Sequence, residues 1–208
     1  MTLQLWLAYA VAATVVVAVP GPTIISVISY SLAHGRKAVV PLVFGVMMGD
    51  IACMSLSLLG LGAVLAASNV LFSVVKLFGA CYLIFLGVRL WFSDPLAAAN
   101  GPAGEAMSHF ALIRSLFITT ATNPKGIVFF MAFLPQFVNP KAPVVPQLLI
   151  LCCTFSCLAT INSTLYALFA GSVREYVRTA RERRWFNRCG GTALIGAGLL
   201  TAAVRRTT

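Results

Sequence analysis

Charged residues are scarce in this chain, and acidic residues are the scarcest of them. Only 10% of the 208 residues are charged, and 15 basic side chains stand against five acidic ones, a formal net charge of +10. With 60% hydrophobic residues and a mean hydropathy of +0.93, this composition indicates an integral membrane protein. The basic residues cluster between apolar runs rather than along one face, which argues against a nucleic-acid partner.

The usual signatures of enzymes and metal sites are also missing. The two histidines lie in or beside expected loops, and the chain lacks metalloprotease, serine-hydrolase and phosphate-loop motifs. Six cysteines fall in or beside apolar runs without a Cys-x-x-Cys pair, so we expect them to pack rather than to ligate metal. We therefore expect no enzyme activity, no cofactor and no metal. Because Met1–Trp6 carries no Lys or Arg, we also expect no signal peptide.

Six apolar runs divide the chain. We expect membrane spans at about residues 3–33, 39–64, 70–92, 111–138, 145–173 and 189–204. The predicted fold is all-α and integral to the membrane, with a single transmembrane transporter domain over 1–208. Its two units cover about 1–92 and 111–208, and a cytoplasmic linker at about 93–110 joins them.

Lysine and arginine set the expected orientation in a bacterial inner membrane. The segments after the first, third and fifth runs hold most of them, including six arginines between positions 174 and 188. The side richer in these residues is normally cytoplasmic, so both termini are predicted to be periplasmic. Arg205 and Arg206 argue weakly against this orientation. We interpret the 174–188 stretch as a topology determinant rather than a nucleic-acid or lipid-binding element.

The first run is too long for one straight span and contains Pro20-Gly21-Pro22. Its roughly 30 residues would extend about 45 Å as a helix, against a bilayer core of about 30 Å. Proline lacks a backbone donor and glycine is permissive, so we expect the helix to break there. Broken backbone inside a membrane is tolerated only against protein or a water-filled cavity. The break is therefore a candidate transport site.

A second break, at Asn123-Pro124-Lys125, suggests an internal repeat. In each half a proline-broken run precedes a run with one mid-span polar residue, Asp50 or Asn162. A cation follows at the same interval of 26 residues, Lys76 or Arg188. Three spans per unit would insert the second unit upside down, which predicts an inverted 3+3 repeat, an architecture of secondary transporters. Chance similarity between apolar helices is the alternative.

Asp50 is the sharpest candidate for chemistry. An ionised carboxylate in mid-span costs at least ~2.5 kcal/mol, so proton uptake should be accessible there. Asp50 could couple protons, bind a substrate amino group, or be structural, by capping broken backbone or pairing with Lys125. Beside it Gly45 and Gly49, like Gly79 and Gly87 in the third run, are expected to let helices approach closely.

Lys125 is the second intramembrane charge. It could face a substrate carboxylate, balance Asp50, or extend its ammonium group to the membrane interface. Free helix N-termini after Pro22 or Pro124 would also favour anions. Asn123, Asn162 and Tyr166 are further polar candidates for the substrate and proton site, and the last two lie one helical turn apart. The full set of candidates is Pro20, Gly21, Pro22, Asp50, Asn123, Pro124, Lys125, Asn162 and Tyr166.

An ordered set of motifs covers about residues 3–204. It comprises Val19-Pro20-Gly21-Pro22, the Gly35 turn, Gly45-x3-Gly49-Asp50, Lys76-x2-Gly79-x2-Tyr82-Leu83-x3-Gly87 and Asn123-Pro124-Lys125-x3-Phe129-Phe130-x2-Phe133-Leu134-Pro135-Gln136-Phe137. The set resembles the lysine-exporter (LysE) superfamily and, more narrowly, its homoserine/threonine-resistance (RhtB-like) branch of bacterial amino-acid exporters. The resemblance implies efflux of amino acids or their derivatives across the inner membrane, driven by protons and without a cofactor.

The predicted function is thus secondary active, proton-coupled efflux of amino acids or their derivatives, of the homoserine, threonine, leucine or lysine type, with the substrate held between the two breaks. The expected partners are the amino-acid substrate, protons and the lipid bilayer, and homo-oligomerisation is left open. A divalent-cation exporter of the same superfamily is one alternative, although it would need several converging carboxylates or thiolates. An intramembrane enzyme or a scaffold that transports nothing are the others.

Overall fold

The regular elements of the chain are all helical. A computed structural model describes residues 1–67, 69–92, 107–139, 142–170 and 180–203, and within them no β-strand occurs. The long helices are α1 (Leu3–Ala18), α2 (Pro22–His34), α3 (Val39–Ala67), α4 (Asn69–Phe92), α5 (His109–Ala121), α7 (Val144–Leu168) and α9 (Ala180–Ala203). The short elements are α6 (Pro124–Val128), the 3-10 turns η1 (Gly35–Ala38) and η3 (Leu134–Phe137), and the π-helical turn η2 (Phe129–Phe133).

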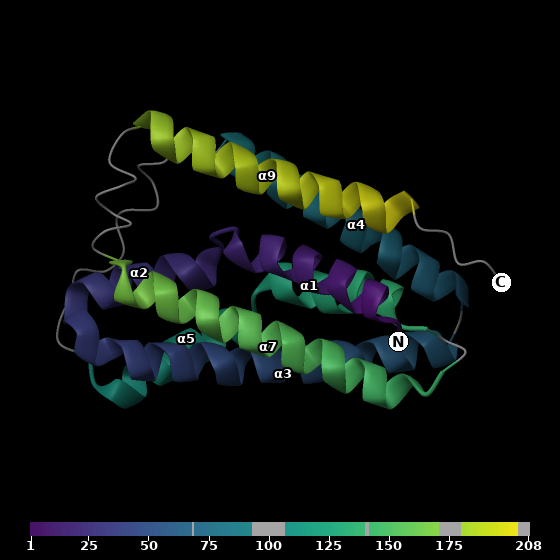
Figure 1. The fold of residues 1–208 in the computed structure, drawn as a ribbon, viewed down its shortest axis with the longest axis horizontal. Coiled ribbons are helices and arrows are strands. Elements are labelled where there is room, and N and C mark those ends of the chain that lie inside the picture. The colour runs from purple at the N-terminus through teal and green to yellow at the C-terminus, as the bar shows by residue number, and fades with distance from the viewer. Residues whose placement is uncertain (68, 93–106, 140–141, 171–179, 204–208) are drawn as a thin grey trace.

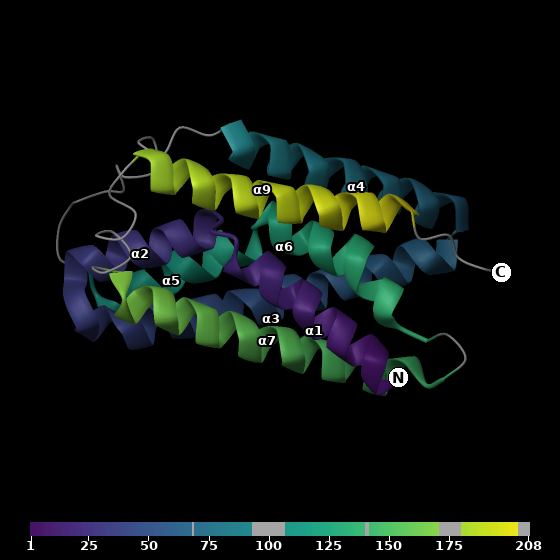
Figure 2. The same cartoon turned by 45° about the horizontal axis from the view of Figure 1, so that its top comes forward.

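The helices lie in two groups (Figures 1 and 2). Helices α4 and α9 run side by side and pack mainly along each other, with smaller contacts from α4 to α3 and α6 and from α9 to α1. In the larger group α3 packs along α5, while α7 contacts α1, α2 and α3. The turn η2 contacts both α3 and α4, so it joins the two groups close to the break that precedes α6.

The hydropathy of several helices suits a membrane. Within the described residues two stretches are long and apolar enough to cross one, Pro22–Gly60 and α7. The pair His109–Ala121 and Pro124–Phe137, bent by 42°, makes a third if it is counted as one span. In both figures the chain turns back between α2 and α3, where Gly35 takes a φ of 68° that favours glycine. The prediction of an all-helical membrane protein is confirmed for the described residues.

Two of the predicted packing glycines lie where α3 meets α5. A Cβ built on Gly45 would lie 2.6 Å from the carbonyl oxygen of Ile113, and one on Gly49 would lie 2.6 Å from Thr120 Cβ. Backbone atoms cannot yield at such distances, so a side chain at either position would push the helices apart. This close approach holds α3, and with it Asp50, against the end of α5.

The other two predicted glycines lie on α4. A Cβ on Gly79 would come within 2.6 Å of Ala132 Cβ in η2, and one on Gly87 within 2.6 Å of the Gly191 carbonyl oxygen in α9. The α4–α9 pair therefore packs backbone to backbone, as small residues permit in membrane helices. Away from these contacts α4 presents large apolar side chains to its surroundings, such as Phe78 and Phe92, which are 73% and 80% exposed.

The last helix differs from the sequence prediction. We expected a span from about Cys189, preceded by a basic loop, whereas α9 already begins at Ala180. Residues 180–188 include four arginines, an alanine and a glutamate, which have high helix propensity, so the helix extends beyond its apolar part. The predicted linker residues 93–106 and the arginines at 174 and 178 lie outside the described residues.

Candidate functional site

The break after α1 leaves particular carbonyl oxygens without the main-chain N–H groups that would normally donate hydrogen bonds to them. In an α-helix the carbonyl of residue i accepts the N–H of residue i+4. For Val16 and Ala18 that residue is Pro20 or Pro22, and neither proline has an N–H to donate. Helix α1 ends at Ala18 and α2 begins at Pro22, so the carbonyls just before the break need partners from elsewhere.

Lys125 provides two of the missing hydrogen bonds. Its Nζ donates to the carbonyl oxygen of Val16 at 2.9 Å and to that of Val19 at 2.8 Å. These lengths are typical of charge-assisted hydrogen bonds. The carbonyl end of a helix carries partial negative charge, which also favours an ammonium group at this position. Lys125 therefore caps α1 from the opposite half of the chain.

Asn162 and Tyr166 of α7 cap the remaining carbonyls of the same turn. Asn162 Nδ2 donates to the Val17 carbonyl oxygen at 3.2 Å, and the Tyr166 hydroxyl donates to that of Ala18 at 3.1 Å. Because the two side chains lie one turn apart, a single face of α7 serves both bonds. All four carbonyls of residues 16–19 thus accept a hydrogen bond from the second half of the chain.

The second break is closed by its own residues. Helix α5 ends at Ala121, and there the backbone N–H of Thr122 donates to Ile118 at 3.0 Å and that of Asn123 to Thr120 at 3.1 Å. The Asn123 side chain caps α6, because its Oδ1 accepts the Lys125 backbone N–H at 3.0 Å. The two breaks are therefore chemically unequal, since within the described residues only the first has backbone carbonyls that are capped by distant side chains.

A cavity of about 60 Å³ lies between the two breaks. Its lining comes from both halves of the chain: Val16, Val17, Gly21, Thr23, Ile24, Val46, Asp50, Thr120, Asn123, Lys125, Gly126, Phe129, Phe155, Ala159 and Asn162. Asp50 and Lys125 are its charged members, and their charges act on each other across it. Within the described chain the Asp50 carboxylate has no hydrogen bond or ion pair, so its oxygens are left for the cavity.

The remaining wall of the cavity is largely apolar. Phe155, Ala159 and Asn162 line it from one face of α7. Phe129 of η2 packs against Phe155 with ring centroids 5.3 Å apart, and it also contacts the buried ring of Tyr9 at 6.1 Å. This aromatic cluster closes the side of the cavity that faces the first half of α1.

The structure brings most of the predicted site residues together. Gly21, Asp50, Asn123, Lys125 and Asn162 line the cavity, whereas Tyr166 acts beside it as a backbone cap. The three prolines among the candidates shape the two breaks and do not line the cavity.

Several cavity residues were not foreseen from the sequence. Thr120, Phe129, Phe155 and Ala159 line the site although they belong to none of the predicted motifs for binding. A signal existed for two of them, because positions 155 and 159 share a helical face with Asn162. Phe129 belongs to the motif from Asn123 to Phe137 that carries the family resemblance, although no binding role was predicted for it, and Thr120 carried no comparable signal.

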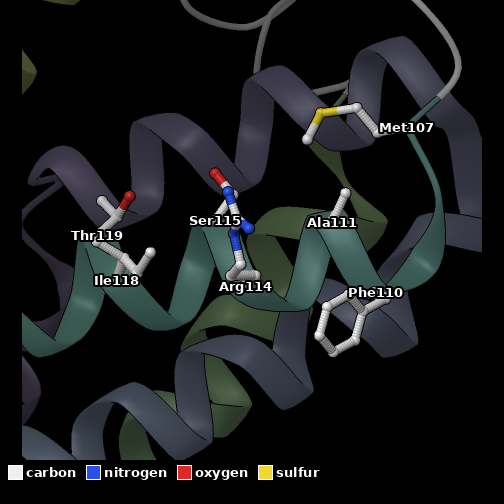
Figure 3. A pocket seen from close by; sticks show the side chains of 7 residues that line it. All are labelled: Met107, Phe110, Ala111, Arg114, Ser115, Ile118 and Thr119. Carbon is white, nitrogen blue, oxygen red and sulfur yellow. The ribbon is translucent and has the colours of Figure 1, made fainter.

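A larger hollow lies away from these residues. It has a volume of about 450 Å³ and is lined by Met107 and the outer face of α5, namely Phe110, Ala111, Arg114, Ser115, Ile118 and Thr119. Figure 3 shows these side chains projecting from α5 and from Met107, which lies two residues before the helix begins. The described lining of this hollow comes from a single helix and the residue Met107, so the hollow cannot enclose a ligand. It is therefore a weaker candidate for the substrate site than the smaller cavity.

Metal ligands do not converge in the described part of the chain. No three His, Cys, Asp or Glu side chains there could hold a metal ion together. The six cysteines are all free thiols, and Cys53 is the buried one among them. The cavity offers a single carboxylate, with hydroxyl and amide groups from Thr23, Thr120 and two asparagines around it.

Comparison with known proteins gives a consistent result over nearly the whole chain. The family model described as LysE type translocator matches residues 14–203. An uncharacterized membrane protein of Vibrio cholerae is 32% identical over 206 residues, covering 99% of this chain and all of that protein. A homoserine/homoserine lactone efflux protein of Salmonella typhimurium is 30% identical over 205 residues, covering 99% of both chains.

A third relative carries a different substrate in its name. The leucine efflux protein of Klebsiella pneumoniae is 30% identical over 205 residues, covering 98% of this chain and 94% of that protein. No solved structure matches the chain.

Proposed function

Because the chain belongs to the family of LysE type translocators, we propose that it exports amino acids or their derivatives across the bacterial inner membrane. The observation that carries this proposal is the cavity between the two helix breaks, which holds one negative and one positive side chain. A zwitterion requires both signs of charge in one place. The names of the relatives, homoserine/homoserine lactone and leucine efflux proteins, support the same class of substrate.

The substrate would lie between Asp50 and Lys125. We assign the ammonium group, or a coupling proton, to the Asp50 carboxylate, which has no hydrogen bond within the described residues. The substrate carboxylate would take the remaining N–H of Lys125 and the N-terminus of α2. No side chain caps that N-terminus in the described structure, and Gly21, Thr23 and Ile24 bring it to the cavity wall.

The proposed architecture is one domain of six spans in an inverted 3+3 repeat, working by alternating access between the two sides of the membrane. It is supported by a helix interruption early in each half, at residues 19–21 and 122–123. The pairing of α4 with α9 supports it too, because these are the third long helices of the two halves. Inverted repeats normally place the substrate where their broken helices meet.

The orientation is proposed from the lysine and arginine distribution, with both termini in the periplasm. In Figure 1 α1 begins and α9 ends at one end of the molecule, while α2 ends and α9 begins at the other. We expect this translocator to catalyse no chemical reaction and to need only its substrate, a proton gradient and the bilayer.

The test is transport by purified protein in proteoliposomes. Proteoliposomes loaded with labelled homoserine, threonine, leucine or lysine should release at least one of these amino acids when a proton gradient is imposed. The release should be faster than from protein-free vesicles that carry the same label. Asp50→Asn should lower that rate at least tenfold, because it removes the cavity's only carboxylate. Transport of manganese or cadmium with no amino-acid transport under any ion gradient would overturn the proposal in favour of a cation exporter.

A further inference from the structure

The positive charge at the carbonyl end of α1 belongs to a side chain of this protein, Lys125, and not to a bound ion. Where a helix ends inside a transporter, its free carbonyls commonly coordinate a coupling cation. Here Lys125 Nζ occupies that place, between the carbonyl oxygens of Val16 and Val19 at 2.9 and 2.8 Å. Lys125 also lines the cavity, and its Nζ lies 3.6 Å from the position that a Cβ on Gly21 would take. One ammonium group therefore touches both the broken backbone and the substrate space.

The two hydrogen bonds depend on the charge of Lys125. An ammonium group has three N–H donors and a full charge, and carbonyl oxygens only accept. A neutral amine keeps two weaker donors and turns a lone pair toward carbonyls that are themselves electron-rich. Loss of one proton would therefore loosen the tie between the end of α1 and α6, so the protonation state of Lys125 would set the backbone geometry at the first break.

Lys125 belongs to a segment of short, irregular helical elements. Helix α6 has only five residues and continues directly into the π-helical turn η2. Short π-helical turns are frequent at functional sites, because their hydrogen-bond pattern can shift by one residue. A change at Lys125 would be transmitted to η2 and to its contacts with α3 and α4.

Other titratable groups of the described chain face this region, but none of them both lines the cavity and binds the carbonyls at the end of α1. Asp50 lies across the cavity on α3, and Cys53 lies one turn further, 3.3 Å from where a Cβ on Gly126 would be. Tyr166 of α7 caps the Ala18 carbonyl beside the cavity. Asn162 both lines the cavity and binds an α1 carbonyl, but it does not titrate, so among the titratable groups of the described residues Lys125 is the one in both positions.

We propose that Lys125 carries the coupling proton of this transporter, which leaves Asp50 to bind the ammonium group of the substrate. This inference rests on the proposed function. The Nζ lone pair takes one proton from water on the periplasmic side, and the new ammonium group rebuilds its hydrogen bonds to Val16 and Val19. Nζ later returns that proton to water on the cytoplasmic side, and the end of α1 is released from α6.

Two assays on one set of proteoliposomes test the proton role. The first measures efflux driven by a pH gradient, and the second measures exchange of labelled for unlabelled amino acid at equal concentrations. Lys125→Arg keeps a cation and its donors but stays protonated at any working pH. Because Lys125 also contacts the substrate, the test compares the two losses: Lys125→Arg should lower gradient-driven efflux at least tenfold more than it lowers exchange, and its exchange rate should be independent of pH.

Tyr166→Phe is the matched control, because it removes a neighbouring cap without changing charge. It should lower exchange and efflux by the same factor and keep the wild-type pH profile. Equal losses of both activities in Lys125→Arg would mean a purely structural cap and would overturn the proposal. So would gradient-driven efflux by Lys125→Arg at the wild-type rate.

A third readout separates this inference from the proposed function. Thermal unfolding of purified protein is followed from pH 6 to 10 without any substrate. The melting temperature of the wild type should rise relative to that of Lys125→Arg as pH rises, because a Lys125 that releases its proton at working pH holds it less tightly than a lysine of the unfolded chain does. Parallel curves would overturn the role of Lys125 even if amino acids are exported. Diverging curves without amino-acid transport would instead count against the proposed substrate.

Discussion

The side-chain amide of Asn123 donates a hydrogen bond of 3.1 Å to the hydroxyl of Thr23, across 100 residues of sequence. Asn123 is the residue before α6, and Thr23 is in the first turn of α2. Thr120 also donates to the same hydroxyl, at 3.4 Å. The segment after the first break and the segment before the second are thereby fastened together, which fixes the cavity between them.

Asn123→Ala should destabilise the protein and impair transport. It removes the donor to Thr23 and the acceptor of the Lys125 backbone N–H, and an unsatisfied buried polar group costs about 1–3 kcal/mol. Thermal unfolding in detergent should show a lower melting temperature, and proteoliposomes should show slower efflux. Thr122→Ala is the control, because that exposed hydroxyl bonds only within its own helix, to Ile118. A shift as large in the control would show that the link between the breaks contributes nothing.

Gly45→Ala should weaken the packing of α3 on α5. The added methyl group would lie 2.6 Å from the carbonyl oxygen of Ile113, which belongs to backbone and cannot move aside. Overpacking of this kind costs about 1–3 kcal/mol, to be measured as a lower free energy of unfolding in detergent.

Gly196→Ala in α9 is the control for that substitution. Nothing lies within 4 Å of the position of its Cβ, so alanine should be neutral or should stabilise the helix by roughly 0.5–1 kcal/mol. Similar effects of the two substitutions would contradict the close approach of α3 and α5.

Ala159 should limit the size of the transported side chain. Apart from the glycines it is the smallest residue that lines the cavity, and it lies between Phe155 and Asn162 on the face of α7. Ala159→Leu should lower efflux of leucine at least tenfold relative to efflux of a smaller amino acid such as threonine. Phe155→Ala should raise the ratio of leucine efflux to threonine efflux. Cys157→Leu, on an exposed part of α7, should leave the ratio unchanged. An unaltered ratio in both cavity variants would exclude this wall from substrate selection.

Tyr9→Phe should be neutral or stabilising. The Tyr9 side chain is fully buried, and its hydroxyl has no hydrogen-bond partner within the described structure. Removing a buried polar group that makes no bond avoids its desolvation cost, which is about 1–3 kcal/mol. Thermal unfolding of Tyr9→Phe beside Tyr166→Phe should show opposite shifts, since Tyr166 bonds the Ala18 carbonyl. A marked loss of stability in Tyr9→Phe would point to a bonded hydroxyl.

The sequence could indicate where regular helix is interrupted, at residues 19–21 and 122–123, because proline acts locally. Pro20 and Pro22 deprive two identifiable carbonyls of their donors whatever the rest of the chain does. The donors that replace them could not be derived in the same way. Lys125 was considered as a carboxylate site or a counter-ion, yet in the structure it holds two carbonyls of α1. That arrangement depends on how the two halves pack, which local spacing does not encode.

The continuation of the fourth run was less predictable. Its apolar residues fit an ordinary helix, but the structure has a five-residue helix, a π-helical turn and a 3-10 turn. Pro135 explains why regular helix cannot continue there. The π-helical turn arises where Phe129, Phe130 and Phe133 pack into the aromatic core, which is a tertiary effect.

The different capping of the two breaks has a consequence for the order in which the chain folds during synthesis. A ribosome releases α1 first, but its final carbonyls have no lasting partner until residues 125, 162 and 166 have been synthesised. The first helix to enter the bilayer would be among the last to reach its final form. An amino-terminal fragment ending near residue 92 should therefore be degraded in cells unless the complementary fragment is produced with it.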